Sequence, residues 1–271
     1  MFNVLSSLFI RLKHSKLFLW FMLVGGIILP VVNCFLEVAL TRFLLDVSLE
    51  ELIYQLNLMG QSGKTISLGE LSITSTGGIF AIICAGVLCA GEFSQGTVKN
   101  CVFAYGRTKT FLAHAVFAPC VIAILVLTSF VGNIICFGIT FGWTVSSNLF
   151  AEFGEILCWI LLCVVNSIAI GSFLNFLIVT IKSTAGSILT FFGVLIGCEI
   201  IFSIVFSIII DPTISTAIIE WLPVYQMQEL ISRATLVNNG DLYLKTLLIG
   251  ATISTLFGFA NYKLWQKVDF K

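Results

Sequence analysis

Charged side chains are scarce in this 271-residue sequence. Only 10% of the residues are Asp, Glu, Lys or Arg, whereas 58% are hydrophobic. A soluble globular domain carries about 25% charged residues because its surface must meet water. The composition therefore excludes an ordinary soluble domain. The charges balance to a net charge of zero, which by itself says nothing about a nucleic-acid partner. We expect no such partner for a chain of this class.

Motifs for metal or redox chemistry are missing as well. Nine cysteines are present, but no two of them form a CxxC pair, and His14 and His114 lie far from any cysteine cluster. Most of the cysteines fall inside apolar runs, where a free thiol behaves as a small hydrophobic side chain. We expect no metal site, no redox site and no cofactor bound by this chain itself.

Two partial motifs fall short of an enzyme. Residues 60–65, GQSGKT, end like a phosphate-binding P-loop, but Leu58 stands where that motif requires its first glycine. Adjacent Glu50 and Glu51 are similar to the paired glutamates of some intramembrane proteases, but Gln55 stands where those enzymes place an arginine. Because no other catalytic set is evident, we predict that the chain is not an enzyme and does not bind ATP.

Long apolar runs are what the sequence has in quantity. A helix that crosses a bilayer needs about 20 consecutive apolar residues, and a polytopic protein built from such helices is all-α. The sequence therefore predicts one transmembrane domain over 1–271 with six spans. The six predicted spans cover residues 17–40, 72–91, 111–138, 153–180, 187–210 and 243–262.

Residues 1–16 have the pattern of a surface helix. One helical face is apolar and Arg11 and Lys13 are displaced from it, which is typical of a helix lying in the membrane interface. A cleaved signal peptide is the alternative, but the apolar run that follows is too long and has no small-residue cleavage site. The apolar face consists of Phe2, Leu5, Leu8, Phe9 and Leu12.

Residues 211–242, before the sixth span, carry two short amphipathic patterns broken at Pro223. We interpret them as outer helices that re-enter the membrane, which requires that protein cover their broken backbone. An ordinary helical hairpin on the outer surface is the alternative.

Basic residues indicate the orientation, because cytoplasmic loops are enriched in Lys and Arg. Placing the N-terminus in the cytoplasm leaves only four of the fourteen basic residues outside. We therefore predict that both termini are cytoplasmic, which agrees with six spans. The four outer basic residues are Arg42, Lys64, Arg233 and Lys245.

Two carboxylates fall within predicted spans, where a charge is costly. Glu199 lies near the middle of the fifth span, whereas Glu37 lies late in the first, where contact with outer water is the simpler explanation. Gly193 and Gly197 form a GxxxG pattern, which lets another helix approach closely. These four residues are our candidates for a substrate path or a dimer interface.

The most polar connection between two spans is GEFSQGTVKNCVFAYGRTKTF, residues 91–111. Val98, Val102 and Tyr105 have the spacing of a short helix, and Gly96 and Gly106 permit sharp turns at its ends. Basic residues in this segment can contact lipid phosphates or an acidic partner surface. A basic loop without a partner is an equally good interpretation of these residues taken alone.

This segment resembles the cytoplasmic segment of ABC-2 type transporter permeases. Residues 92–100, EFSQGTVKN, and 105–109, YGRTK, are similar to the family pattern, in which a Glu, a Gly-Thr-x-Lys and a Gly-Arg recur between the second and third spans. The basic N-terminal helix and the layout of the spans are similar too. His114 departs from the family pattern, because many members place a lysine there.

The resemblance implies the membrane subunit of a bacterial ABC exporter in the plasma membrane. A cytoplasmic ATPase subunit, which binds ATP and Mg, would dock on a coupling helix within residues 92–110, and a second permease copy or a sister permease would complete a dimer. In lacking a large outer domain, the chain resembles permeases that expel amphipathic or antimicrobial peptides. We therefore expect such a peptide or another hydrophobic compound as the substrate. The implied coupling residues are Glu92, Gly96, Thr97, Lys99, Val102, Tyr105, Gly106 and Arg107.

Two other functions stay open. An ion-coupled secondary transporter would need an ion site near the membrane midplane, for which Glu199 alone qualifies. An intramembrane enzyme is the less favoured alternative, because it would need a charged or histidine-bearing catalytic set.

Overall fold

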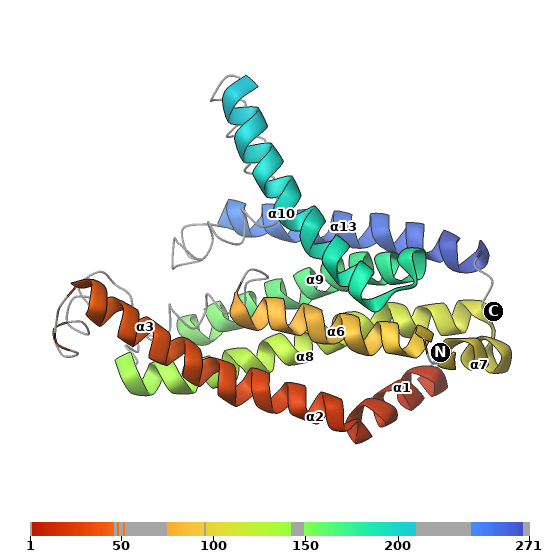
Figure 1. The fold of residues 1–271 in the computed structure, drawn as a ribbon, viewed down its shortest axis with the longest axis horizontal. Helices are drawn as coiled ribbons and strands as arrows, with labels where there is room; N and C mark the ends of the chain where they lie inside the picture. The colour runs from red at the N-terminus through yellow and green to blue at the C-terminus, as the bar shows by residue number, and fades with distance from the viewer. Residues whose placement is uncertain are drawn as a thin grey trace.

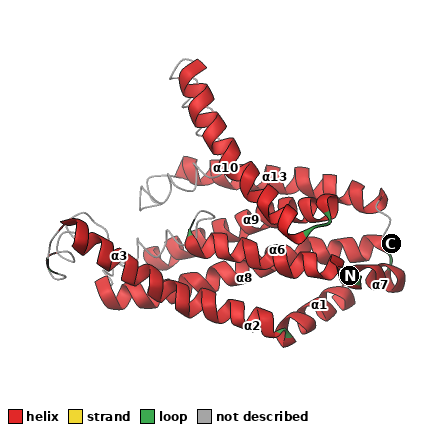
Figure 2. Ribbon diagram, viewed as in Figure 1, coloured by secondary structure: helices red, strands yellow, loops and turns green. Residues whose placement is uncertain are grey.

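The computed structural model describes residues 2–45, 48, 51, 75–94, 96–141, 149–209 and 240–267. Over these residues the chain is helical and contains no strand (Figure 2). The partial P-loop at 60–65 lies outside the described residues. So does the predicted outer helical segment 211–242, apart from its last three residues, which begin the final helix.

The described helices follow one another with short breaks, and several exceed 25 residues (Figure 1). A π-helical segment, η1, interrupts the first long helix at the glycine pair of the sequence VGGII. In chain order the elements are α1 (Phe2–His14), α2 (Lys16–Leu23), η1 (Val24–Ile28), α3 (Leu29–Leu45), α6 (Thr76–Ser94), α7 (Thr97–Tyr105), α8 (Arg107–Phe141), α9 (Leu149–Ile181), α10 (Thr184–Ile209) and α13 (Gly240–Lys267).

Among the described residues, five helices are long and apolar enough to cross a membrane. They coincide with the predicted first, second, third, fourth and sixth spans, so the apolar helical architecture of a membrane-embedded protein is confirmed. The predicted fifth span corresponds to the 26-residue helix α10, and the six-span topology stays a prediction. The five helices run over Lys16–Leu36, Thr76–Phe93, Arg107–Thr140, Ile156–Ile181 and Tyr243–Lys267.

Helix α8 is the centre of the bundle. The elements α1, α3, η1, α6, α7, α9 and α13 all pack against it, and α13 also lies along α9. Helix α10 starts against α9 and α6 and then extends away from the bundle (Figure 1). The start of α1, α7 and the end of α13 lie together at one end of the molecule (Figure 1).

Glycines allow the closest approaches between these helices. Gly171 of α9 lies against the ring of Pro119 in α8, and a Cβ at position 171 would come within 2.7 Å of the ring atoms. Gly132 of α8 lies against the carbonyl oxygen of Gly26 in η1. Between membrane helices, van der Waals packing replaces the hydrophobic effect as the source of association, and small residues maximise it.

Helix α1 packs against the bundle by a face made of Val4, Leu8 and Leu12, which are all buried. Leu8 and Leu12 belong to the predicted apolar face, but Val4 was not predicted to lie on it. Phe2, which was predicted to lie on that face, is exposed. Ser15 separates α1 from α2 and caps α2, because its Oγ accepts a hydrogen bond of 3.4 Å from the Phe18 N–H. The predicted N-terminal helix is thus present and ends where the first span begins.

The connection between α9 and α10 is a two-residue turn, Lys182 and Ser183. Lys182 has a φ of 57°, which is unusual for a residue other than glycine. Ser183 caps the next helix, because its Oγ accepts a hydrogen bond from the Gly186 N–H and its carbonyl oxygen accepts one from the Ser187 N–H. The turn lies between the predicted fourth and fifth spans, 153–180 and 187–210.

Candidate functional site

The short helix predicted between Gly96 and Gly106 is present as α7, a nine-residue helix between α6 and α8. Gly96 precedes it with φ 70° and ψ 6°, and Gly106 follows it with φ 85° and ψ 156°. Both conformations favour glycine, and the second is essentially restricted to it because a Cβ would meet the neighbouring backbone. The two glycines therefore set the angles at which the chain enters and leaves α7.

The inner face of α7 is apolar. Val98 is only 1% exposed and packs with Phe111, Val179 and Trp265, which come from α8, α9 and α13. Val102 packs against the same cluster. The predicted coupling residue Val102 thus faces the bundle, so it can hold α7 in place while other residues of α7 face outward.

The outer face of α7 is exposed and mixed in character. Lys99, Asn100, Phe103 and Ala104 lie on it at the i, i+1, i+4 and i+5 spacing of one helical face. The Phe103 side chain is 78% exposed, and the neighbouring Tyr105 is 42% exposed. Phe103 was missing from the sequence-based site, although its position four residues after Lys99 could have indicated it.

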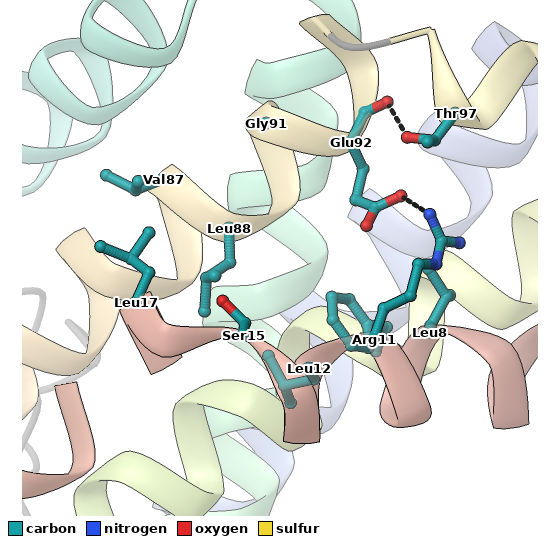
Figure 3. A pocket seen from close by; sticks show the side chains of 11 residues that line it. Leu8, Arg11, Leu12, Ser15, Leu17, Val87, Leu88, Gly91, Glu92 and Thr97 are labelled. Carbon is teal, nitrogen blue, oxygen red and sulfur yellow. Dashed lines mark hydrogen bonds and ion pairs between the residues drawn. The ribbon is translucent and has the colours of Figure 1, made fainter. Parts of the chain in front are cut away.

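Glu92 joins three elements at the end of α6. Its Oε2 lies 2.9 Å from Nη1 of Arg11 on α1, with side chains 17% and 39% exposed respectively. The Glu92 carbonyl oxygen accepts a hydrogen bond of 2.7 Å from Oγ1 of Thr97 at the start of α7 (Figure 3). The structure therefore brings together the predicted residues Glu92 and Thr97 and adds Arg11, which the sequence placed only on the N-terminal helix.

Arg107 ties the start of α8 to the end of α13. Its Nη1 donates a hydrogen bond of 2.7 Å to the carbonyl oxygen of Gln266, in the last turn of α13. A cation at a helix C-terminus also interacts favourably with the partial negative charge there. Arg107 was predicted to contact lipid or a partner, but in this structure it contacts the chain itself.

An aromatic cluster lies directly beneath α7. The His114 ring is buried and lies 5.7 Å from the rings of Phe93 and Trp265, measured between centroids. Trp265 also packs edge-on against Phe93 and Phe111. The Asn175 side chain donates a hydrogen bond of 3.0 Å to the His114 carbonyl oxygen and so links α9 to α8. His114, the departure from the family pattern, is therefore part of the packed base of the site.

The four candidates for a substrate path or dimer interface lie apart from α7. Gly193 and Gly197 are on α10, and a Cβ built on either meets nothing within 4 Å. Within the part of the chain that the structure describes, nothing covers these two positions. The side chains of Glu37 and Glu199 lie outside what the structure describes, although their backbones belong to α3 and α10.

Replacing Gly106 with alanine is expected to lower the free energy of unfolding by about 1–3 kcal/mol, because its φ and ψ are strained for any other residue. Gly91, on the helical part of α6 with nothing within 4 Å of its Cβ position, is the matched control and tolerates alanine. Thermal unfolding in detergent, followed by circular dichroism, measures the stability of the Gly106→Ala and Gly91→Ala variants. Equal melting temperatures for the two variants would contradict the assigned turn.

No protein-family model, curated protein or solved structure matches this chain. The likeness to ABC-2 permeases therefore stays an expectation drawn from residues 92–109.

Proposed function

We propose that this chain is the transmembrane permease subunit of an ATP-driven exporter, and that α7 is the helix on which a separate ATPase subunit docks. The observation that carries the proposal is α7 itself, a short helix between glycine turns that joins two membrane-length helices. Its outer face offers a cation, Lys99, and an exposed aromatic ring, Phe103. Aromatic side chains of this kind are frequent anchors in protein interfaces.

Several contacts are suited to carry a movement of α7 into the bundle. Thr97 binds the end of α6 and, through Glu92, is linked to Arg11 of α1. Val98 packs against α8, α9 and α13. An ATPase that closes on ATP would displace α7 together with these elements. The bundle would then shift between inward-open and outward-open arrangements, provided that the ATP-bound partner favours one of them.

We further propose an amphipathic peptide, including antimicrobial peptides, or another hydrophobic compound as the cargo. A groove of about 640 Å³ between the first long helix and α8 supports an apolar cargo, because Thr128 is the one polar side chain among those that line it. Both termini and α7 are assigned to the cytoplasm and the protein to the bacterial plasma membrane. A second permease, identical or a sister chain, would complete the transporter.

The experiment is purification of the tagged chain from its native membrane in mild detergent, followed by measurement of vanadate-sensitive ATP hydrolysis in the eluate. The wild type is expected to carry an ATPase subunit whose hydrolysis rate responds to this chain. Lys99→Glu and Phe103→Asp are each expected to reduce the recovered activity about tenfold or more, because loss of one anchor contact of 1.4 kcal/mol changes binding tenfold.

Lys13→Glu is the matched control, because Lys13 is exposed on α1 and lies outside the segment 91–111. All three variants have to show the wild-type melting temperature, since the substituted side chains are exposed. Equal ATPase recovery from every variant would contradict docking on α7. Uptake or release of cargo driven by an ion gradient, without the ATPase, would instead support the secondary transporter.

A further inference from the structure

A cavity of about 300 Å³ lies between the end of α1, the start of α2 and the end of α6 (Figure 3). Its lining changes character along its length. Leu17, Val87 and Leu88 lie at one end, and Arg11, Glu92 and Thr97 lie at the other (Figure 3). The cavity is therefore amphipathic, and its volume is at the lower limit of small-molecule sites, which measure about 300–1,000 Å³.

The direction of this polarity follows the long helices. Val87 and Leu88 belong to the membrane-length part of α6, and Glu92 lies one turn further along, at the end of that part. Leu17 lies in the first turn of the first membrane-length helix, whereas Arg11 lies on α1, outside it. The polar end of the cavity thus lies at the edge of the apolar zone and the apolar end lies within it, as a lipid molecule does in a bilayer.

The polar end separates hydrogen-bond donors from acceptors. On one side, Arg11 is a cation whose guanidinium group carries only N–H donors. On the other side, Glu92 is an anion, and the Thr97 hydroxyl, which donates to the Glu92 carbonyl oxygen, can still accept. A ligand that fits both sides carries an anion and an N–H cation close together.

The Arg11–Glu92 ion pair lines the cavity and is partly exposed. The Arg11 side chain is 39% exposed, and the Glu92 side chain, at 17%, is half-buried. A ligand with a single charge would pair with one partner and leave the other unpaired beside a like charge. A zwitterion replaces the one internal pair by two new ones and leaves neither side chain unpaired.

We propose that this cavity binds the phosphoethanolamine headgroup of a membrane lipid. The phosphate pairs with Arg11, the ammonium group pairs with Glu92 and Thr97, and the acyl chains continue past Leu17 and Val87 into the bilayer. Phosphocholine fits less well because its trimethylated nitrogen has no N–H to donate. Phosphoglycerol lacks the cation and would place its phosphate near an unpaired Glu92. This assignment does not depend on the exporter function, because it does not involve the outer face of α7.

The test is native mass spectrometry of the full-length chain in detergent, incubated with equal amounts of phosphatidylethanolamine, phosphatidylcholine and phosphatidylglycerol that share the same acyl chains. Phosphatidylethanolamine is expected to be retained about tenfold over each of the other two, the value of one charge-assisted contact. This comparison needs no variant. Equal retention of the three lipids by the wild type would overturn the proposal.

Two variants test the binding of the ammonium group and of the phosphate separately. Glu92→Gln is expected to abolish the preference for phosphatidylethanolamine over phosphatidylcholine, because it removes the partner of the ammonium group. Arg11→Gln is expected to lower the retention of all three phosphate-bearing lipids, and Arg11→Lys to restore part of it. Lys13→Gln, on the same helix but not lining the cavity, is the matched control and retains the wild-type pattern.

A soluble source of the same headgroup is tested by adding glycerophosphoethanolamine, which lacks the acyl chains. The lipid assignment predicts that it displaces bound phosphatidylethanolamine only at concentrations far above that of the lipid. Displacement at equal concentrations would assign the cavity to a soluble ligand and overturn the lipid. Unchanged lipid retention in both Glu92→Gln and Arg11→Gln would show that lipid binds elsewhere and would also overturn the proposal.

Discussion

Replacing Gly132 with valine is expected to lower the free energy of unfolding by about 3 kcal/mol or more, the upper part of the range for overpacking a core. A Cβ at this position would overlap the carbonyl oxygen of Gly26 in η1 and lie 2.7 Å from Cγ of Pro30. A backbone oxygen cannot rotate away as a side chain can. The first long helix would therefore have to move away from α8, the centre of the bundle.

Gly258→Val is the matched control for this experiment. Gly258 is also in a membrane-length helix, α13, but a Cβ there meets nothing within 4 Å. Thermal unfolding in detergent, followed by circular dichroism and by size-exclusion chromatography, is expected to show a large loss for Gly132→Val and little change for Gly258→Val. If both variants have the melting temperature of the wild type, the close approach of η1 to α8 described here is contradicted.

Replacing Trp265 with alanine is expected to cost about 3–5 kcal/mol, as for other large aromatic side chains removed from a packed site. Trp265 is 1% exposed and contacts the rings of Phe93, Phe111 and His114 at centroid distances of 5.7, 5.9 and 5.7 Å. It also covers Val98 of α7. Its loss would leave a cavity that separates the end of α13 from α6, α7 and α8.

Phe259→Ala, on the same helix, is the control for Trp265→Ala. The Phe259 side chain is 64% exposed, and the Lys263 ammonium group lies 5.3 Å from the centroid of its ring. Such an exposed contact contributes about 0.5–1 kcal/mol. Limited proteolysis of the end of α13, together with the melting temperature, distinguishes the two variants. If the end of α13 is equally resistant to proteolysis in both variants, the aromatic cluster does not hold α13 against α7.

The long helices were predictable because a bilayer-length apolar run has few alternatives to a helix. Their ends were less predictable. Helix α8 begins at Arg107 and α13 ends at Lys267, outside the predicted spans, because polar residues at a membrane surface can continue a helix into water. Gly96 and Gly106 predicted the limits of α7 correctly, since glycine is the residue that tolerates their positive φ values.

The position of α7 in the chain was predictable, but the contacts of the residues in and around α7 were less so. Sequence spacing placed Val98 and Val102 on one face of α7 but did not say that this face turns inward, nor that Phe103 is left exposed. The partners of Arg11 and Arg107, 81 and 159 residues away in the chain, could not be found by local pattern. Contacts of such sequence separation depend on how the helices pack.

The sequence by itself determined that this chain is a set of apolar helices with a short polar helix between two of them. It did so because helix periodicity, apolar length and glycine turns are local properties, encoded within about 20 residues. Only the tertiary structure decided which face of α7 is covered, that Glu92 meets Arg11, and that an amphipathic cavity forms beside them. The physical reason is that these features arise from the packing of α1, α6, α7, α8 and α13 against one another, and the packing energy of each residue depends on neighbours that are distant in the chain.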